Sequence, residues 1–331
     1  MKKKIMAVYD VDPRFAERFA EAVDQKERVP FTVIAFSSIE RLKRFSEEEP
    51  IEILLIDAKL KAEAEGIKAG QVVLLSDGEV IPDPGGEQAV YKYQSTDHII
   101  REVMACYSAS PVQPLPALVG DKSILVGVYS PINRCLKTSF SLVLGQILAK
   151  DSAVLYLNLE DCSGLRKLLG QSGPGDLSDL LYYHSQGGFS WARLKSLVYS
   201  WGSLDYILPA RYPEDLCQVS GEQMAELLSS LAGEGMYDTI IVDLGQFGKK
   251  AADILKICDG IYMPVRQDKV SVAKIEEFEE YILVSGHEKI LEKVQRLKLP
   301  YPNSFGGQRD YLEQLLWGEL GDYVRQLLKG K

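Results

Sequence analysis

The sequence has little cysteine, no surplus of basic residues and no long hydrophobic run. Its five cysteines among 331 residues are scattered, and no two have the spacing of a zinc or redox motif. We interpret them as reduced thiols of a cytoplasmic protein. The net charge of −9 argues against nucleic-acid binding and against a basic membrane-facing surface, so any membrane association is expected to be indirect.

No apolar stretch approaches the roughly 18 residues of a membrane-spanning helix. Met1 and the three lysines after it resemble the start of a signal peptide, but the apolar run that follows stops at Asp10 and is too short. The composition is typical of a soluble globular chain, and the length predicts two or three domains.

Residues 124–150, ILVGVYSPINRCLKTSFSLVLGQILAK, suggest phosphate binding. Residues 124–128 have the pattern of a short buried strand, and from Thr138 apolar residues recur every three or four positions, as in a helix. In a phosphate-binding loop, a strand and a loop lead to Lys-Thr at a helix start, where the Lys contacts phosphates and the Thr meets Mg²⁺. The candidate nucleotide-binding residues are Asn133, Arg134, Cys135, Leu136, Lys137, Thr138 and Ser139.

This loop lacks the two glycines that the motif requires, six residues and one residue before the Lys. Their places hold Pro131 and Leu136. Proline has no N–H to offer a phosphate, and a non-glycine residue in the left-handed conformation costs about 1–2 kcal/mol. The loop has therefore either changed shape or weakened its grip on phosphate. A surface helix start with a solvated Lys137 is the alternative interpretation.

Residues 1–108 alternate between strand and helix patterns. Strands are predicted at 5–9, 30–36, 51–56, 71–75 and 89–91, and helices at 15–23, 38–46 and 98–107. This alternation predicts a parallel sheet covered on both faces, whose ligands bind at the carboxyl ends of the strands. The polar residues expected there are Asp10, Asp12, Asp57, Ser76 and Lys92.

Clustered carboxylates with a lysine can bind Mg²⁺ and accept a phosphoryl group, although strand-end capping is the simpler alternative. The segments VYDVDP, LLIDAKL and LLSD, with Tyr91 and Lys92, resemble the receiver domain of bacterial response regulators. The resemblance implies that Asp57 is a phospho-acceptor, Ser76 a switch residue and Lys92 a phosphate contact. Receivers have two adjacent acidic residues, but Val11 follows Asp10 here, so a receiver-like fold used for docking is the competing expectation.

Residues 109–121, ASPVQPLPALVGD, contain three prolines and predict a stiff linker. It separates a receiver-like domain, residues 1–108, from a second domain, residues 122–331. In the second domain strands are predicted at 124–128, 153–158, 206–209, 238–243 and 260–265. Helices between them are predicted at 164–169, 177–183, 190–198, 223–232 and 251–257, which again gives a doubly wound parallel sheet.

Two acidic strand ends in this domain complete a candidate site. Asp243 ends an apolar strand, as does the second Mg²⁺-side carboxylate of phosphate-loop proteins, and Glu160 follows the strand at 153–158. Glu160 and Asp243 are the catalytic candidates, and Thr138 and Asp243 the Mg²⁺ candidates. An ordinary strand-end turn is the alternative for either acid.

In this order YSPINRCLKTS, VLYLNLED, YDTIIVDLGQFG and ICDGIYMPVRQDKVSVAKIEEF resemble the phosphate loop, switch I, Walker B and base-side segments of the ParA/MinD group of ATPases. With a receiver-like domain in front, the whole chain resembles the TadZ/CpaE-type proteins of Tad (Flp) pilus assembly. The resemblance implies ATP and Mg²⁺ as cofactors and a homodimer. It also implies pilus secretion and assembly proteins as partners, which would recruit the chain to a cell pole or the inner membrane.

Two departures from the group bear on activity. Asn158 stands where an Asp is usual, and an amide cannot accept a proton at neutral pH, which argues against rapid hydrolysis. The group's lysine that reaches a partner's phosphate corresponds to Ile132, and Arg134, two residues away, is our hypothesis for its substitute.

Residues 309–331 contain an amphipathic helix. Its acidic and basic residues roughly balance, whereas membrane-surface helices are rich in Lys and Arg. We therefore expect this helix to pack on the second domain or on a partner.

Three functional interpretations remain open at this point. The first is a nucleotide-binding assembly protein with weak or absent ATP hydrolysis, a degenerate ATPase. The second is a catalytically dead scaffold, and the third is a response regulator controlled by phosphorylation.

Overall fold

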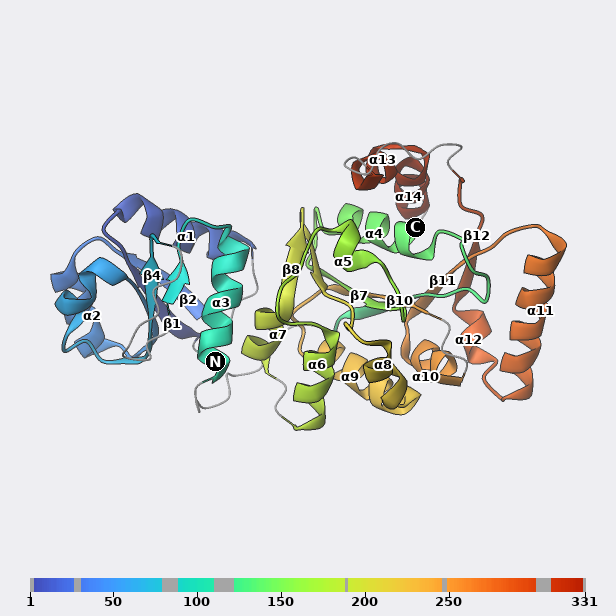
Figure 1. Ribbon diagram of the computed structural model, residues 1–331, viewed down its shortest axis with the longest axis horizontal. Coiled ribbons are helices and arrows are strands. Elements are labelled where there is room, and N and C mark those ends of the chain that lie inside the picture. Colours follow the sequence, from blue (N-terminus) through green and yellow to red (C-terminus); the bar gives the residue numbers. More distant parts are fainter. Residues whose placement is uncertain are drawn as a thin grey trace. The chain divides into compact units, whose positions relative to one another are not determined.

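The computed structural model describes residues 3–26, 31–78, 89–109, 122–187, 190–245, 249–301 and 311–329. The chain forms two compact units (Figure 1). One comprises Met1–Leu118 and Gly187–Val198, and the other comprises Val119–Gln186 and Tyr199–Lys331. Residues 110–121, which make up nearly all of the predicted linker, lie outside the described residues.

The first unit is built on a five-stranded sheet of order β2-β1-β3-β4-β5, in which every pair is parallel. Its elements are β1 (Lys4–Tyr9), α1 (Pro13–Lys26), β2 (Phe31–Phe36), α2 (Ile39–Glu48), β3 (Ile51–Asp57), η1 (Ala58–Ala64), β4 (Ala69–Ser76), β5 (Ala89–Tyr91), α3 (Thr96–Ala109) and α7 (Trp191–Leu197). The chain order reverses between β1 and β3, which is where doubly wound folds bind ligands.

Helices cover both faces of this sheet. Helix α2 and η1 lie on one face, where Leu42 shares a core cluster with Leu54 and Ile56, and α1 and α3 lie on the other (Figure 1). Strand β3, IEILLID, is apolar over several consecutive residues because a strand covered on both sides has no solvent face.

Helix α7 comes from the second half of the chain but packs with the first unit. The indole ring of Trp191 meets the ring of Phe31 edge-on, with 6.0 Å between centroids, and Phe31 in turn meets Tyr107 of α3 at 5.9 Å. Ser190 caps the helix by accepting the Arg193 N–H. The sequence predicted this helix but gave no sign that it belongs with the first unit.

The second unit is built on a seven-stranded sheet of order β12-β11-β6-β10-β7-β9-β8. Its strands are β6 (Ile124–Val128), β7 (Val154–Leu159), β8 (Val198–Trp201), β9 (Leu204–Ile207), β10 (Thr239–Leu244), β11 (Gly260–Pro264) and β12 (Val294–Leu297). Its helices are α4 (Lys137–Leu148), α5 (Leu165–Leu168), α6 (Leu177–Ser185), α8 (Pro213–Gln218), α9 (Gly221–Gly233), α10 (Lys249–Ile257), α11 (Lys269–Val284), α12 (Lys289–Glu292), α13 (Tyr311–Trp317) and α14 (Glu319–Lys329).

The central strands of this sheet are parallel and set the site. Strand β10 lies between β6 and β7, and its Asp243 is in register with Val128 of β6 and Asn158 of β7. Helices α4, α13 and α14 lie on one face of the sheet and α9 and α10 on the other (Figure 1). The predicted α/β class with doubly wound parallel sheets is thus confirmed.

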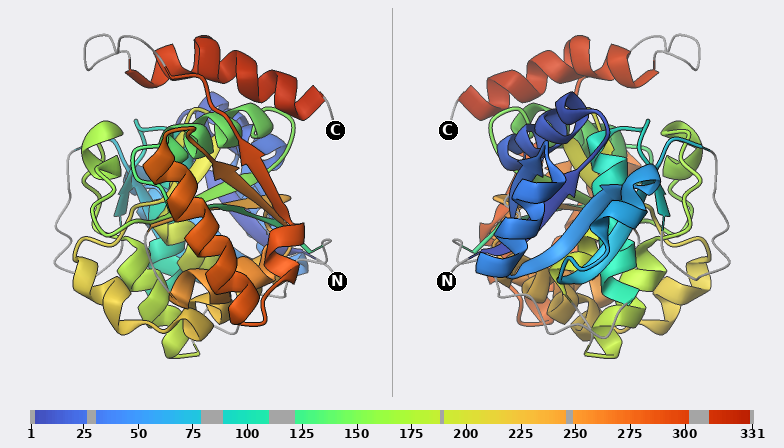
Figure 2. Two further views of the ribbon diagram at one scale, coloured as in Figure 1. Left: turned by 90° about the vertical axis from the view of Figure 1, so that its right-hand side faces the viewer. Right: turned by 90° about the vertical axis from the view of Figure 1, so that its left-hand side faces the viewer.

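The C-terminal tail forms two helices, α13 and α14, with Gly318 between them, rather than the single predicted helix. They pack over α4 (Figures 1 and 2), and Leu315, Leu320 and Val324 share the core cluster of Phe140. The apolar side of the tail therefore packs on the second unit itself, as its balanced charge predicted.

Some short elements carried no sequence signal. Strand β12, VQRL, exposes Gln295 and Arg296 at the sheet edge, so it has no apolar run. Strand β9 begins two residues earlier than predicted, because Leu204 is fully buried in the core. Within the described ranges, none of the helices combines the length and the apolar character needed to cross a membrane.

Replacing Trp191 by Ala should destabilise the first unit by about 3–5 kcal/mol, the usual cost of truncating a buried aromatic side chain. Trp191 is 5% exposed, whereas Trp317 is 64% exposed, so Trp317→Ala is the control and should cost less than about 1 kcal/mol. Urea denaturation with limited proteolysis of the first unit measures both. A Trp191→Ala variant whose first unit resists proteolysis as wild type does would contradict the assignment of α7 to this unit.

Candidate functional site

The loop between β6 and α4 has left-handed backbone conformations at residues that are not glycine, where they are energetically costly. Leu136 adopts φ 65° and ψ 26°, the left-handed conformation, and Arg134 has φ 54°. These are the non-glycine residues with positive φ in the described part of the chain. Each costs about 1–2 kcal/mol, so the loop has kept a glycine-type turn without its glycine.

Contacts on both sides of the loop hold this strained shape. Ile132 and Cys135 are buried and pack in one cluster with Ile275 of α11. The Ser130 hydroxyl donates to the Pro264 carbonyl at the end of β11 (2.7 Å) and accepts the Ile132 N–H (3.3 Å). Ile132 therefore anchors the loop, while Arg134 is exposed.

Helix α4 begins in a buried position without a side-chain cap. Its N-cap residue, Leu136, makes no capping hydrogen bond. By contrast, the side chains of Ser38, Asp176 and Ser220 cap α2, α6 and α9, respectively. The first N–H groups of a helix have no intrahelical acceptor and carry the positive end of its dipole. This helix start is therefore suited to an anion.

Lys137 is the first residue of α4, and its side chain is 6% exposed. Its Nζ lies 3.4 Å from Oε1 of Glu160, which follows β7. Gly245, just after β10, lets the chain pass close to Glu160, since a Cβ at that position would lie 3.0 Å from the Glu160 Cα. The lysine that would meet a phosphate thus has a carboxylate beside it.

Asp243 is completely buried at the end of β10. Its Oδ2 accepts hydrogen bonds from the Tyr156 hydroxyl (3.0 Å) and from Nδ2 of Asn158 (2.9 Å). Its Oδ1 has no hydrogen-bond partner among the described residues. An unpartnered carboxylate oxygen in the interior is costly and marks a place for a ligand.

The environment of Asp243 disfavours its charged form. Burial, and then the negative charge of Glu160, raises the pKa of Asp243 to about 7, while the nearby Thr138 hydroxyl as a donor, the positive charge of Lys137 and the Tyr156 hydroxyl oppose the rise. A bound cation would reverse this balance, because a positive charge favours the carboxylate.

The residues present fit a Mg²⁺ ion. The unpartnered Oδ1 of Asp243 and the hydroxyl of Thr138, which is close enough to affect that carboxyl's pKa, are the hard oxygen groups that Mg²⁺ prefers. The fold thus brings Lys137, Thr138, Glu160 and Asp243 together. Ser139 instead shares a hydrogen bond with the hydroxyl of Tyr311 on α13 (3.0 Å).

Sequence reasoning missed Tyr156, which bonds to Asp243. A signal was available, because Tyr156 and Asn158 lie two residues apart in β7 and therefore on the same face of the sheet. What the sequence could not show is that β10 is the neighbour of β7.

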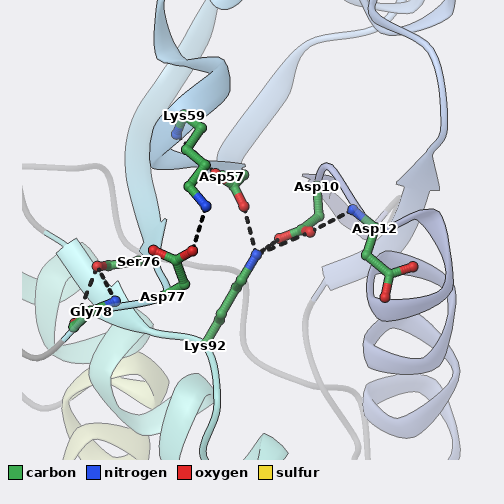
Figure 3. Close-up of polar contacts among 8 residues, drawn as sticks. All are labelled: Asp10, Asp12, Asp57, Lys59, Ser76, Asp77, Gly78 and Lys92. Atoms are coloured by element: carbon green, nitrogen blue, oxygen red, sulfur yellow. Dashed lines mark hydrogen bonds and ion pairs between the residues drawn. The ribbon is translucent and has the colours of Figure 1, made fainter.

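In the first unit, Asp10, Asp57 and Lys92 form a buried cluster, called here the Asp57 cluster (Figure 3). The Lys92 Nζ lies 2.6 Å from Oδ2 of Asp57 and 3.2 Å from both carboxylate oxygens of Asp10. Burial alone would lower the pKa of Lys92, but its bonds to Asp57 and Asp10 outweigh this and raise it. The lysine therefore stays charged.

The carboxylate oxygens of the Asp57 cluster all have partners. Oδ1 of Asp57 accepts the N–H of Lys59, and Oδ1 of Asp10 accepts the N–H of Asp12. The Asp12 side chain caps the Arg14 N–H instead of joining the cluster, and the Ser76 hydroxyl bonds to Gly78 (Figure 3). No group of three or more His, Cys, Asp or Glu residues suited to a metal occurs in the described segments.

No protein-family model matches this sequence, and no curated protein matches it significantly. Among solved structures, a ParA family ATPase from Chlorobium tepidum is similar with a TM-score of 0.48 and 16% identity, covering 62% of this chain and 98% of its own. A plasmid partition protein from Borrelia burgdorferi gives 0.45 and 14%, covering 64% and 100%. The septum site-determining protein MinD from Pyrococcus horikoshii, complexed with Mg-ADP, gives 0.43 and 16%, covering 55% and 72%. Similarity this low transfers no function, so the site is interpreted from its own residues.

Leu136→Gly should leave the free energy of unfolding unchanged within about 1 kcal/mol, because relief of the left-handed strain offsets the entropy that glycine loses on folding. Leu136→Val should destabilise by roughly 1–2 kcal/mol, since β-branched residues fit this conformation worst. Urea denaturation compares the two variants with wild type. A valine variant as stable as the glycine variant would show that the loop is not strained.

Asp243→Asn should change how stability depends on pH. The folded protein holds the Asp243 proton up to about pH 7, whereas the unfolded chain releases it near pH 4, so wild type loses stability as pH rises between these values. The loss is on the order of 4 kcal/mol for a shift of about three pKa units. Urea denaturation of wild type and Asp243→Asn in EDTA from pH 4 to 8 measures this loss. If the free energy of unfolding depended on pH in the same way in both proteins, the raised pKa of Asp243 would be contradicted.

Proposed function

We propose that the chain is a nucleotide-binding protein of the ParA/MinD kind, which binds ATP with Mg²⁺ and hydrolyses it weakly or not at all. The observation that carries this proposal is the buried Asp243 carboxylate, whose unpartnered Oδ1 lies in the same site as Thr138 and Lys137. Bound Mg²⁺ would neutralise phosphate charge, held by the Thr138 hydroxyl and Asp243.

The start of α4 supports phosphate binding. It offers uncapped N–H groups, the positive helix end and the buried Lys137. An incoming phosphate would take over the position of the Glu160 carboxylate beside the Lys137 ammonium. Pro131 gives no N–H, so the grip is weaker than that of a glycine-rich loop.

Weak hydrolysis follows from the acids near the phosphate position. The amide of Asn158 cannot accept a proton, and its atoms are already committed to Tyr156, Asp243 and the Glu160 N–H. Glu160 is the remaining candidate base, but its carboxylate is already paired with the Lys137 ammonium (3.4 Å) and so is not free to take a proton from water.

The proposed role in pilus assembly rests on the presence of both units in one chain. A receiver-like sheet in front of a ParA/MinD-like unit supports a TadZ/CpaE-type protein that localises Tad (Flp) pilus machinery at a cell pole or the inner membrane. The internally satisfied Asp57 cluster supports docking rather than phosphorylation for the first unit. Ile132, which takes the place of the group's dimer-bridging lysine, is buried, whereas Arg134 is exposed and could reach a partner's phosphate. The exposed Arg134 therefore supports nucleotide-dependent homodimers.

Calorimetric titration of ATP with Mg²⁺ tests the proposal. Wild type should bind with micromolar affinity, and Lys137→Ala should bind roughly 10–100-fold more weakly, as expected for loss of a charge-assisted phosphate contact. Lys150→Ala, an exposed position two residues past the C-terminal end of α4, is the matched control and should bind like wild type. Glu160→Gln should bind a few-fold more tightly, because phosphate no longer competes with a carboxylate for Lys137.

Sedimentation of the same samples tests the homodimer, which ATP should promote in wild type but not in Arg134→Ala. Absence of binding to wild type would refute nucleotide binding and leave the scaffold interpretation. Incorporation of phosphate from a small-molecule donor into wild type but not Asp57→Asn would refute the docking role of the first unit.

A further inference from the structure

The network around Asp243 carries one inference beyond nucleotide binding. We propose that Tyr156 and Asn158 are positioning residues, which hold the Asp243 carboxylate by Oδ2 and so reserve Oδ1 for the Mg²⁺ of a bound nucleotide. This inference rests on the proposed function, because it concerns the metal side of the same site.

Every hydrogen of the network has a defined place. Nδ2 of Asn158 donates one hydrogen to Oδ2 of Asp243 (2.9 Å) and the other to the Tyr156 hydroxyl (2.9 Å), which donates its own to the same Oδ2 (3.0 Å). Oδ1 of Asn158 accepts the Glu160 N–H (3.0 Å), which fixes the direction of the amide. The three side chains form a closed triangle of hydrogen bonds in the buried interior.

Strand register makes this triangle rigid. Asn158 lies directly beside Asp243 in the parallel pair of β7 and β10, and Tyr156 lies two residues earlier on the same face. All three residues are at most 1% exposed, so water does not compete for their bonds. Both donors reach the same oxygen, and the carboxylate is therefore locked in one rotation, with Oδ1 left over.

The amide at position 158 is consequently a required donor. An Asp there would place a carboxylate oxygen 2.9 Å from Oδ2 of Asp243 in place of the amide nitrogen, and two buried acids would repel each other. If the amide were not needed as a donor, Asn158→Asp would leave Mg²⁺ binding unchanged or would improve it by adding a carboxylate near the metal. Positioning by the amide predicts the opposite.

Tyr156→Phe tests the inference with a split readout. The protein is titrated with ATP carrying a fluorescent methylanthraniloyl label, first in EDTA and then, once saturated, with MgCl₂. Affinity in EDTA should change less than about 2-fold, while the Mg²⁺ midpoint should rise about 10-fold, the usual loss when a group supporting a metal ligand is removed. Asn158→Asp should shift the midpoint in the same direction.

Tyr206→Phe is the matched control, because Tyr206 is equally buried and lies beside Tyr156 in β9, but in the described part of the chain its hydroxyl makes no hydrogen bond to Asp243. It should leave both readouts unchanged. An unchanged Mg²⁺ midpoint in Tyr156→Phe would overturn the inference. So would equal losses with and without metal, which indicate a merely structural role, or a tighter midpoint in Asn158→Asp.

Failure of the proposed function is distinguishable from failure of this inference. If wild type binds the labelled ATP under neither condition, nucleotide binding is refuted, and Mn²⁺ titration of the nucleotide-free protein by electron paramagnetic resonance decides the positioning role. Weaker Mn²⁺ binding in Tyr156→Phe than in wild type supports it. Equal or absent binding overturns it.

Discussion

The second unit is arranged around one buried carboxylate. Asp243 lies in the interior because β10 is the central neighbour of β6 and β7, and a charge in that position is unfavourable unless hydrogen bonds or a cation compensate it. Tyr156 and Asn158 compensate one oxygen. The other oxygen has no hydrogen-bond partner among the described residues, and Thr138 and Lys137 at the start of α4 act on the same carboxyl by opposing the rise in its pKa. One oxygen of the buried carboxylate is thus satisfied within the protein, and the other is left for a ligand.

The loop before α4 has a backbone conformation that is unfavourable for its own residue types. Leu136 and Arg134 are held in left-handed conformations by burial of Ile132 and Cys135 against Ile275. Strain of this kind persists only where the surrounding structure determines it, and it concentrates at functional sites. Burial of Ile132 also means that apolar packing against α11 holds this part of the loop.

In the first unit, by contrast, the buried carboxylates have all their oxygens satisfied. Lys92 compensates both Asp57 and Asp10, and backbone N–H groups satisfy their remaining oxygens, so the cluster is complete without a ligand. Removing one partner of a buried ion pair of this kind costs several kcal/mol, because the other charge is left buried and unpaired. The chain thus combines one closed polar cluster with one open site.

Sequence alone determined both sheets, because parallel strands buried on two faces read as apolar runs such as IEILLID and DTIIVD, and it placed Lys137, Thr138, Glu160 and Asp243 at strand and helix ends. It could not determine which strands are neighbours, since strand order is set by packing of distant segments. For that reason Tyr156 was missed and Asp12 was grouped with a cluster that its side chain does not join. Tertiary structure alone decided that Leu136 keeps a glycine-type turn, because that strain is offset by contacts from α11, more than a hundred residues away in the chain, and that α7 completes the first unit.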